Sequence, residues 1–211
     1  MADVNGAQIA TLGLTGGIAC GKSSASAFLE GMGAKVIDAD KISRAVTAPG
    51  GAALPAIESC FGAGVFMANG SLNRRELASR VFADDAQRRA LEGIIHPLVQ
   101  QQTLKTMREL AGAGVSSVIL DVPLLYETGM DVLCDEVWVL AVPHEEQVKR
   151  IMERDGLNED QAQARIEAQM SMDEKQARAD RVIWTNRSIQ ATQRELEMLW
   201  QVWLRRVERG R

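Results

Sequence analysis

Residues 16–23 read GGIACGKS and match the pattern G-x-x-x-x-G-K-[ST]. They lie between an apolar run at residues 8–14, which we expect to form a strand, and residues 21–32, which we expect to form a helix. The glycines allow backbone N–H groups to converge on phosphate oxygens, and the helix directs its positive N-terminal end at the same anion. A chance match in a chain of this length has odds of roughly one in a hundred. The stretch therefore predicts a strand, a loop and a helix that together bind the phosphates of a nucleotide.

The loop and the first turn of its helix supply the candidate phosphate-binding residues. Lys22 is expected to neutralise charge on the β- and γ-phosphates, and the Ser23 hydroxyl is expected to bind Mg²⁺. A nucleoside triphosphate with magnesium is therefore the predicted ligand. Cys20 lies near a helix N-terminus, an environment that lowers the pKa of a thiol, which gives the hypothesis that it is sensitive to alkylation. The cofactor-binding candidates in this stretch are Gly17, Ile18, Ala19, Cys20, Gly21, Lys22, Ser23 and Ser24.

The composition is that of one soluble α/β domain, with 211 residues of which 46% are hydrophobic and 25% are charged. No apolar run reaches the length needed to span a bilayer. Residues 1–8 lack the features of a signal peptide, so a cytoplasmic location is expected. The net charge of −4 argues against nucleic-acid binding, and a monomer is favoured. The wide spacing of Cys20, Cys60 and Cys134 fits free thiols better than a disulfide framework or a zinc site.

Apolar runs and helical patterns alternate along the rest of the chain. Strands are predicted at residues 34–37, 115–120, 136–142 and 181–185. Helices are predicted at residues 75–82, 86–110, 145–154 and 158–170. A last amphipathic helix, whose tryptophans are expected in the core, carries Leu196, Leu199, Trp200, Trp203, Leu204 and Val207. This alternation predicts an α/β fold of the P-loop NTPase type, with a doubly wound parallel sheet of five strands.

The phosphate loop by itself leaves several classes of protein open, because GTPases, ATPase motors, transporters and small-molecule kinases all use it. The N-K-x-D motif with which GTPases read their base is absent from the sequence. Motors and transporters are usually longer, so a compact kinase is the economical interpretation. Two alternatives stay open. One is a kinase of the same fold that acts on a nucleoside or a nucleotide, and the other is a binding protein that nucleotide occupancy switches.

As a kinase, the chain is predicted to form a single domain over residues 1–211, with three kinds of segment. The core is expected at residues 8–50, 112–145 and 180–211. A helical substrate-binding insertion is expected at about residues 51–111, and a helical lid at about residues 146–179.

Several further blocks of sequence resemble the dephospho-CoA kinase family. They are LTGGI at 14–18 with Lys22 and Ser23, VIDAD at 36–40, HPL at 96–98, DVPLLYE at 121–127, and Gln147, Arg150, Arg154, Arg165 and Gln169. In order and spacing these blocks cover nearly the whole chain. The family transfers the γ-phosphate of ATP to the ribose 3′-hydroxyl of dephospho-CoA, which completes coenzyme A. The resemblance implies this activity here, with ATP, Mg²⁺ and dephospho-CoA as ligands.

Three carboxylates follow predicted strands, where α/β sheets bind their ligands. Spacing alone leaves open which of Asp38 and Asp40 faces the phosphates, and a helix cap explains Asp38 about as well. The family pattern implies that Asp40 is catalytic and binds the substrate, by orienting the attacking hydroxyl and accepting its proton. Lys22 and Arg154 are the other catalytic candidates. Asp121 ends the hydrophobic run at residues 118–120, which resembles the Walker B arrangement, where a carboxylate holds magnesium. Ser23 and Asp121 are therefore the metal-binding candidates.

His96, Leu124 and Glu127 lie in blocks that the resemblance assigns to acceptor binding. The turn at residues 123–127 is expected to shape the acceptor pocket, where Glu127 would hold a substrate hydroxyl or a basic residue. A purely structural turn is an equal alternative. His96 precedes Pro97 in a helical pattern, and its ring could instead satisfy a backbone group that the proline leaves without a partner.

Arginines and one asparagine complete the predicted nucleotide site. Arg150 and Arg154 lie four residues apart on a predicted helix, so they are expected to project towards a shared target such as phosphate. A solvated charged face is the alternative. Arg165 falls on the next predicted helix of the lid, whose closure would exclude water. Asn186 follows the last strand, where the resemblance implies a loop that contacts adenine.

The sequence departs from the family pattern at the loop and near the adenine position. The family usually has glycine and serine where this chain has Ala19 and Cys20, and we expect phosphate binding to survive that change. Ser188 stands where a glycine commonly follows Asn186, which leaves the backbone less free to adopt positive φ and bears on base specificity.

Overall fold

The computed structural model describes residues 2–4 and 7–210. The chain forms two compact units, which we call the sheet unit (residues 1–37 and 107–211) and the helical unit (residues 38–106). The boundaries of the helical unit differ from those predicted for the insertion, and whether this unit binds an acceptor stays a prediction.

The sheet unit contains the strands β2 (Ala7–Gly16), β3 (Val36–Asp38, entering the helical unit at its last residue), β4 (Ser117–Asp121), β5 (Glu136–Ala141) and β6 (Arg181–Trp184). Their order across the sheet is β3-β4-β2-β5-β6, and β2 pairs in parallel with both β4 and β5. All residues of β4 and β5 are buried, as expected for strands covered on both faces. The predicted parallel sheet of five strands is confirmed.

A short additional strand, β1 (Ala2–Val4), pairs antiparallel with β2. The sequence analysis did not predict it. A strand of this length carries too few residues to show the period-2 alternation by which strands are recognised.

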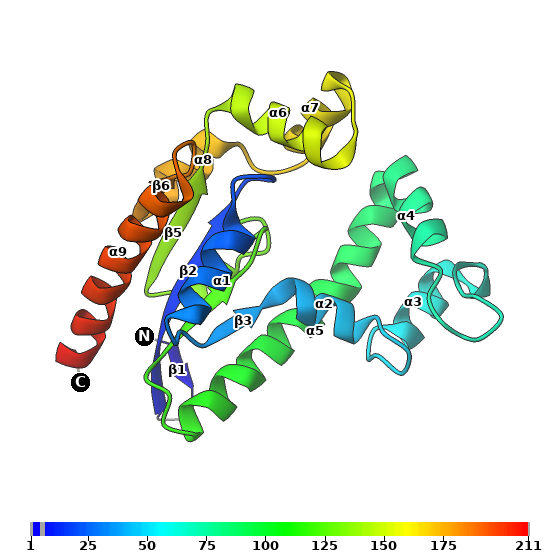
Figure 1. The fold of residues 1–211 in the computed structure, drawn as a ribbon. Helices are drawn as coiled ribbons and strands as arrows, with labels where there is room; N and C mark the ends of the chain where they lie inside the picture. The colour runs from blue at the N-terminus through cyan, green and yellow to red at the C-terminus, as the bar shows by residue number, and fades with distance from the viewer. Residues whose placement is uncertain (1, 5–6, 211) are drawn as a thin grey trace. The chain divides into compact units, whose positions relative to one another are not determined.

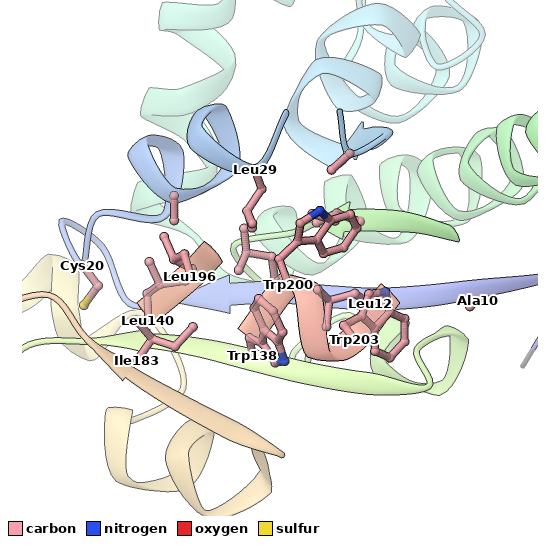
Figure 2. Packing of buried hydrophobic residues seen from close by; sticks show 14 of the residues in the cluster. Ala10, Leu12, Cys20, Leu29, Trp138, Leu140, Ile183, Leu196, Trp200 and Trp203 are labelled. Atoms are coloured by element: carbon pink, nitrogen blue, oxygen red, sulfur yellow. The ribbon is translucent and has the colours of Figure 1, made fainter. Parts of the chain in front are cut away.

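One face of the sheet is covered by α1 (Lys22–Gly31) and α9 (Ile189–Arg209), as Figure 1 shows. Figure 2 shows the core on this face, where Trp200 and Trp203 of α9 lie with Leu12 of β2 and Trp138 of β5. The tryptophans predicted for the core are therefore buried there, at 2% and 3% exposure. Because this packing fixes α1 against the sheet, it also fixes the loop that connects β2 to α1.

Two helices, α6 (His144–Asp155) and α7 (Glu159–Glu167), lie beyond the carboxyl ends of β2 and β5, and α8 (Met172–Arg178) packs against β5. We call residues 144–178, which carry them, the lid segment. The helix predicted over residues 158–170 corresponds to α7, which ends at Glu167, whereas α8, which begins at Met172, was not predicted. Ser171 accepts a hydrogen bond from Glu174 N and so caps α8, a start signal that the sequence analysis missed. The 3-10 helix η2 (Met130–Leu133) precedes β5.

The helical unit contains α2 (Ala39–Val46), α3 (Leu54–Phe61), the 3-10 helix η1 (Ala63–Val65), α4 (Arg74–Ala83) and most of α5 (Asp85–Gly112). Pro97 lies inside α5, which continues past it. Among the described residues, no helix is both long enough and apolar enough to cross a bilayer.

Candidate active site

The loop between β2 and α1 has a backbone that few residue types allow. Gly21 adopts φ of 83°, and Gly16 approaches β5 so closely that an added Cβ would lie 2.6 Å from Leu140 O. Ala19 has φ of 60°, a left-handed conformation that costs a non-glycine residue about 1–2 kcal/mol. This positive φ gives a physical reason for the glycine that the family usually has there. A strained conformation of this kind persists only where surrounding contacts fix the backbone, so such contacts must hold Ala19.

The structure brings two predicted site residues, Lys22 and Asp121, into one ion pair. Asp121 ends β4 beside Leu14 of β2, so the carboxyl end of one strand faces the start of the helix that follows its neighbour. Lys22 Nζ donates to Asp121 Oδ1, and the two side chains are only 14% and 6% exposed. A pair so well shielded holds the ammonium group at the mouth of the loop, where it can reach phosphate oxygens.

The first turn of α1 faces outwards from the loop. Its N-cap, Gly21, provides no side-chain hydrogen bond, so the backbone N–H groups at this helix end are open to an anion. Ser23 and Ser24 are both exposed in this turn. Their hydroxyls and the Asp121 carboxylate are hard oxygen donors, the ligand type that Mg²⁺ prefers.

Arg150 contacts the outer side of the same loop. Its guanidinium donates to Ala19 O (3.5 Å), to Thr185 Oγ1 (3.3 Å) and to Thr185 O (3.0 Å), and it pairs with Glu146 at 2.8 Å. The sequence predicted that Arg150 binds phosphate, and the structure places Arg150 against the loop that would hold the phosphate.

A cavity of about 240 Å³ opens beside the first turn of α1. Its lining includes Ser24, Arg150, Thr185, Arg187 and Ile189. Ile189 is 70% exposed, an unusual state for a large apolar side chain at a helix start. The lining joins a guanidinium to an apolar side chain next to the phosphate loop, which suits a planar base. Asn186, the predicted adenine contact, is exposed in the turn between Thr185 and Arg187.

Arg154 and Arg165 do not share the target of Arg150. Both pair with Asp155, Arg154 Nε at 2.8 Å and Arg165 Nη1 at 2.5 Å. Hydrogen bonding to Asp155 raises the pKa of Arg154, and hydrogen bonding to Arg154 lowers the pKa of Asp155. Arg154 is 55% exposed, so its catalytic role stays a prediction.

The turn after β4 is anchored by a fully buried lysine of α8. Lys175 Nζ lies 2.8 Å from Glu127 Oε1 and donates to Pro123 O at 3.1 Å. Glu127 also accepts from Met170 N at 3.0 Å. Glu127 thus holds a basic residue, one of the two partners that the sequence suggested for it. Leu124, the neighbouring acceptor candidate, is partly buried.

The candidates Asp38, Asp40 and His96 belong to the helical unit. Asp38 is the N-cap of α2, where its Oδ1 accepts from Lys41 N at 3.0 Å, so the capping alternative describes its position. Asp40 lies in the first turn of the same helix with an exposed side chain. His96 is partly buried within α5, one residue before Pro97.

The hypothesis of a reactive Cys20 is wrong. The side chain is fully buried at the edge of the core in Figure 2, and burial raises the pKa of the thiol above its ordinary value. The helix N-terminus, which would lower the pKa, does not offset this desolvation, because the thiol faces the core and not the loop opening.

We therefore expect Cys20 to resist alkylation in the folded protein. With excess iodoacetamide at neutral pH, exposed Cys60 should be modified first, whereas Cys20 should react only at the rate of unfolding. Peptide mass spectrometry over a time course measures both rates, and addition of denaturant provides the control in which all three thiols react. Modification of Cys20 as fast as Cys60 in the folded protein would contradict the burial argument.

Sequence comparison places the whole arrangement in a known family. A family model described as dephospho-CoA kinase matches residues 10–191. A dephospho-CoA kinase of Symbiobacterium thermophilum is 47% identical over 189 residues, which make up 90% of this chain and 79% of that protein. The dephospho-CoA kinase of Geobacillus kaustophilus is 42% identical over 193 residues, which make up 92% of this chain and 96% of that protein.

Solved structures agree with the sequence comparison. The structure of dephospho-CoA kinase from Campylobacter jejuni has a TM-score of 0.69 at 30% identity, covering 90% of this chain and 95% of that chain. A shikimate kinase from Acinetobacter baumannii, at 16% identity and a TM-score of 0.51, covers 95% of this chain and 96% of its own and shares the fold. The family match extends over most of the sequence and includes the loop and the Lys22–Asp121 pair. This chain therefore belongs to the dephospho-CoA kinase family.

Proposed function

We propose that this protein transfers the γ-phosphoryl group of ATP to the ribose 3′-hydroxyl of dephospho-CoA, giving coenzyme A and ADP in the last step of coenzyme A biosynthesis. The observation that carries the proposal is the buried Lys22–Asp121 pair at a phosphate loop, in a chain that aligns over 90% of its length with a dephospho-CoA kinase. The loop supports nucleotide binding, and the family alignment supports the acceptor.

In the proposed reaction, the residues of the loop hold and neutralise the triphosphate. Backbone N–H groups at the start of α1 bind phosphate oxygens, and the Lys22 ammonium group balances charge that moves to the bridging oxygen as the γ-phosphoryl group leaves. The cavity lined by Arg150, Thr185 and Ile189 holds the adenine, and Asn186, next to Thr185 in the chain, contacts the base.

Magnesium is part of the same proposal. Ser23 and Asp121 would hold the ion, because each offers an oxygen ligand and Mg²⁺ is usually bound by one or two protein oxygens together with substrate phosphates. When bound there, the ion would supply positive charge that neutralises part of the negative charge of the triphosphate.

The acceptor side of the reaction is assigned from the family resemblance. Asp40 orients the 3′-hydroxyl and accepts its proton late in the transfer, and its exposed position in the first turn of α2 leaves the carboxylate accessible to substrate. His96, Leu124 and Glu127 contact the acceptor. Arg154 acts from the lid by exchanging Asp155 for phosphate when nucleotide is bound, which its partly exposed ion pair permits.

Release of ADP with a panel of acceptors tests the proposal. Purified protein with ATP and Mg²⁺ is expected to release ADP rapidly with dephospho-CoA, and at background rate with AMP, CMP, dTMP or no acceptor. Stimulation by a monophosphate alone would replace the acceptor. Tight binding of ATP without stimulation by any acceptor would favour a nucleotide-switched binding protein.

A further inference from the structure

Three successive carbonyl groups of the phosphate loop each accept a hydrogen bond from a side chain elsewhere in the sheet unit. Ile18 O accepts from Gln147 Nε2 at 2.9 Å. Ala19 O accepts from Arg150 Nη1 at 3.5 Å, and Cys20 O accepts from Thr185 Oγ1 at 3.0 Å. Gln147 and Arg150 lie three residues apart on α6, so one face of that helix serves two adjacent carbonyls.

The direction of these carbonyls matters because a loop that binds an anion must turn its N–H groups inwards. The carbonyl oxygens of the same peptides then point outwards, where they need donors of their own. Ala19, with φ of 60°, lies in the middle of this run, and its strain would be relieved if the adjoining peptides rotated. Hydrogen bonds to Ile18 O and Ala19 O oppose that rotation on both sides of the strained residue.

Burial of Gln147 leaves one of its two side-chain polar groups without a hydrogen bond among the described residues. Gln147 is 1% exposed, and its Oε1 atom has no hydrogen-bond partner among the described residues. A buried amide with half of its polar groups unsatisfied costs free energy. We therefore infer that the hydrogen bond from Nε2 to Ile18 O is the reason for a polar side chain at this position. Gly17 makes the approach possible, because a Cβ at that position would lie 2.6 Å from Gln147 Nε2.

We propose that Gln147 and Thr185 are positioning residues for phosphoryl transfer, which hold Ile18 O and Cys20 O outwards so that the N–H groups of the same two peptides, those of Ala19 and Gly21, stay directed at the nucleotide phosphates. The N–H group of the peptide between them, Cys20 N, donates to Gly17 O at 3.2 Å. This inference rests on the proposed function and deepens it, since it names residues outside the loop that prepare the loop for ATP. Gln147 can have this effect without touching the nucleotide, whereas Thr185 also lines the cavity assigned to adenine. Arg150 contributes to the same set of bonds and also lines the adjacent cavity.

The hydroxyl of Thr185 is tested by a pair of variants. Thr185→Val keeps the shape of the side chain and removes both the donor to Cys20 O and the acceptor for Arg150 Nη1, whereas Thr185→Ser keeps both and removes a methyl group. Thr185→Val is expected to weaken ADP binding, measured by calorimetry, about 3- to 10-fold, and Thr185→Ser is expected to restore most of it. The melting temperature of each variant is measured in parallel without nucleotide.

Gln147 is tested by the same logic with a matched control. Gln147→Met retains the length of the side chain and removes both the donor and the unsatisfied acceptor, so stability should be maintained while ADP affinity falls about 3- to 10-fold. The control is Gln163→Met on α7, a partly buried glutamine whose partners, His144 and Glu167, both lie in the lid segment. That control should bind ADP like the wild-type protein.

The results separate this inference from a purely structural role and from the identity of the acceptor. ADP affinity equal to wild type in both Thr185→Val and Gln147→Met, or a serine variant no better than valine, would overturn it. A loss of melting temperature with unchanged ADP affinity would also overturn it, because it would reduce the two residues to packing. ADP binding needs no acceptor, so the expected losses would support the inference even if dephospho-CoA failed in the acceptor assay.

Discussion

Replacing Lys22 with alanine is expected to lower kcat/KM for ATP by about 10³-fold, the upper end of the range for removal of one preorganised charge stabiliser. The Lys22 ammonium group is held at the loop by its buried pair with Asp121, so it requires no reorganisation when the phosphates arrive. Water that fills the vacated space cannot replace a fixed positive charge. Steady-state kinetics with dephospho-CoA measure the effect.

The same substitution should also reduce stability, because it leaves the Asp121 carboxylate buried without its cation. Removing one partner of a buried pair typically costs about 3–5 kcal/mol, whereas replacing both partners is often close to neutral. Lys22→Ala with Asp121→Asn should therefore recover part of the lost free energy of unfolding in urea and none of the activity. Lys149→Ala, at an exposed position of α6, is the control for loss of a lysine. An active Lys22→Ala variant would contradict the proposed mechanism.

Asp40→Asn is expected to lower kcat by about 10²- to 10³-fold while the melting temperature changes little, since positioned proton acceptors contribute on the order of 10²- to 10⁴-fold. Asparagine retains the shape of the side chain and loses the charge that orients the hydroxyl and accepts its proton. The side chain is exposed in the first turn of α2, so the change should leave the packing of the helix intact.

Asp38 provides a matched control two residues earlier in the chain. It caps α2 through the bond from Lys41 N, and asparagine is an equally good N-cap, so Asp38→Asn should preserve both stability and activity. The measurement is kcat for both variants together with their melting temperatures. Equal losses of kcat in the two variants, or loss in Asp38→Asn alone, would assign the catalytic carboxylate differently.

Local sequence patterns were sufficient for the elements that carry the site. The β2 strand, the loop and α1 were predictable because the motif joins an apolar strand to a helix through glycines whose backbone geometry few other residues can adopt. The buried tryptophans of α9 followed from helical periodicity. The short helix α8 was not predicted, since a serine cap at Ser171 is a weak signal for a helix of so few residues.

The chemistry of individual side chains was harder to predict, because it depends on neighbours that are distant in sequence. Proximity to a helix N-terminus suggested a reactive Cys20, but burial raises the pKa of its thiol and makes it unreactive. Arg150 and Arg154 share a helix face by spacing, yet one contacts the loop and the other pairs with Asp155. Thr185 carried no sequence signal at all, because its role depends on a hydrogen bond to a residue 165 positions away.

The sequence by itself therefore determined the class of fold, the phosphate loop and the family, since each depends on residue types at fixed local spacing. The tertiary structure alone decided which side chains surround that loop. It brought Asp121 to Lys22, and Gln147 and Thr185 to the loop carbonyls, across separations of about a hundred residues or more. The physical reason is that strand order and helix packing set these distances, and both arise from burial of apolar surface over the whole unit and not from any local pattern.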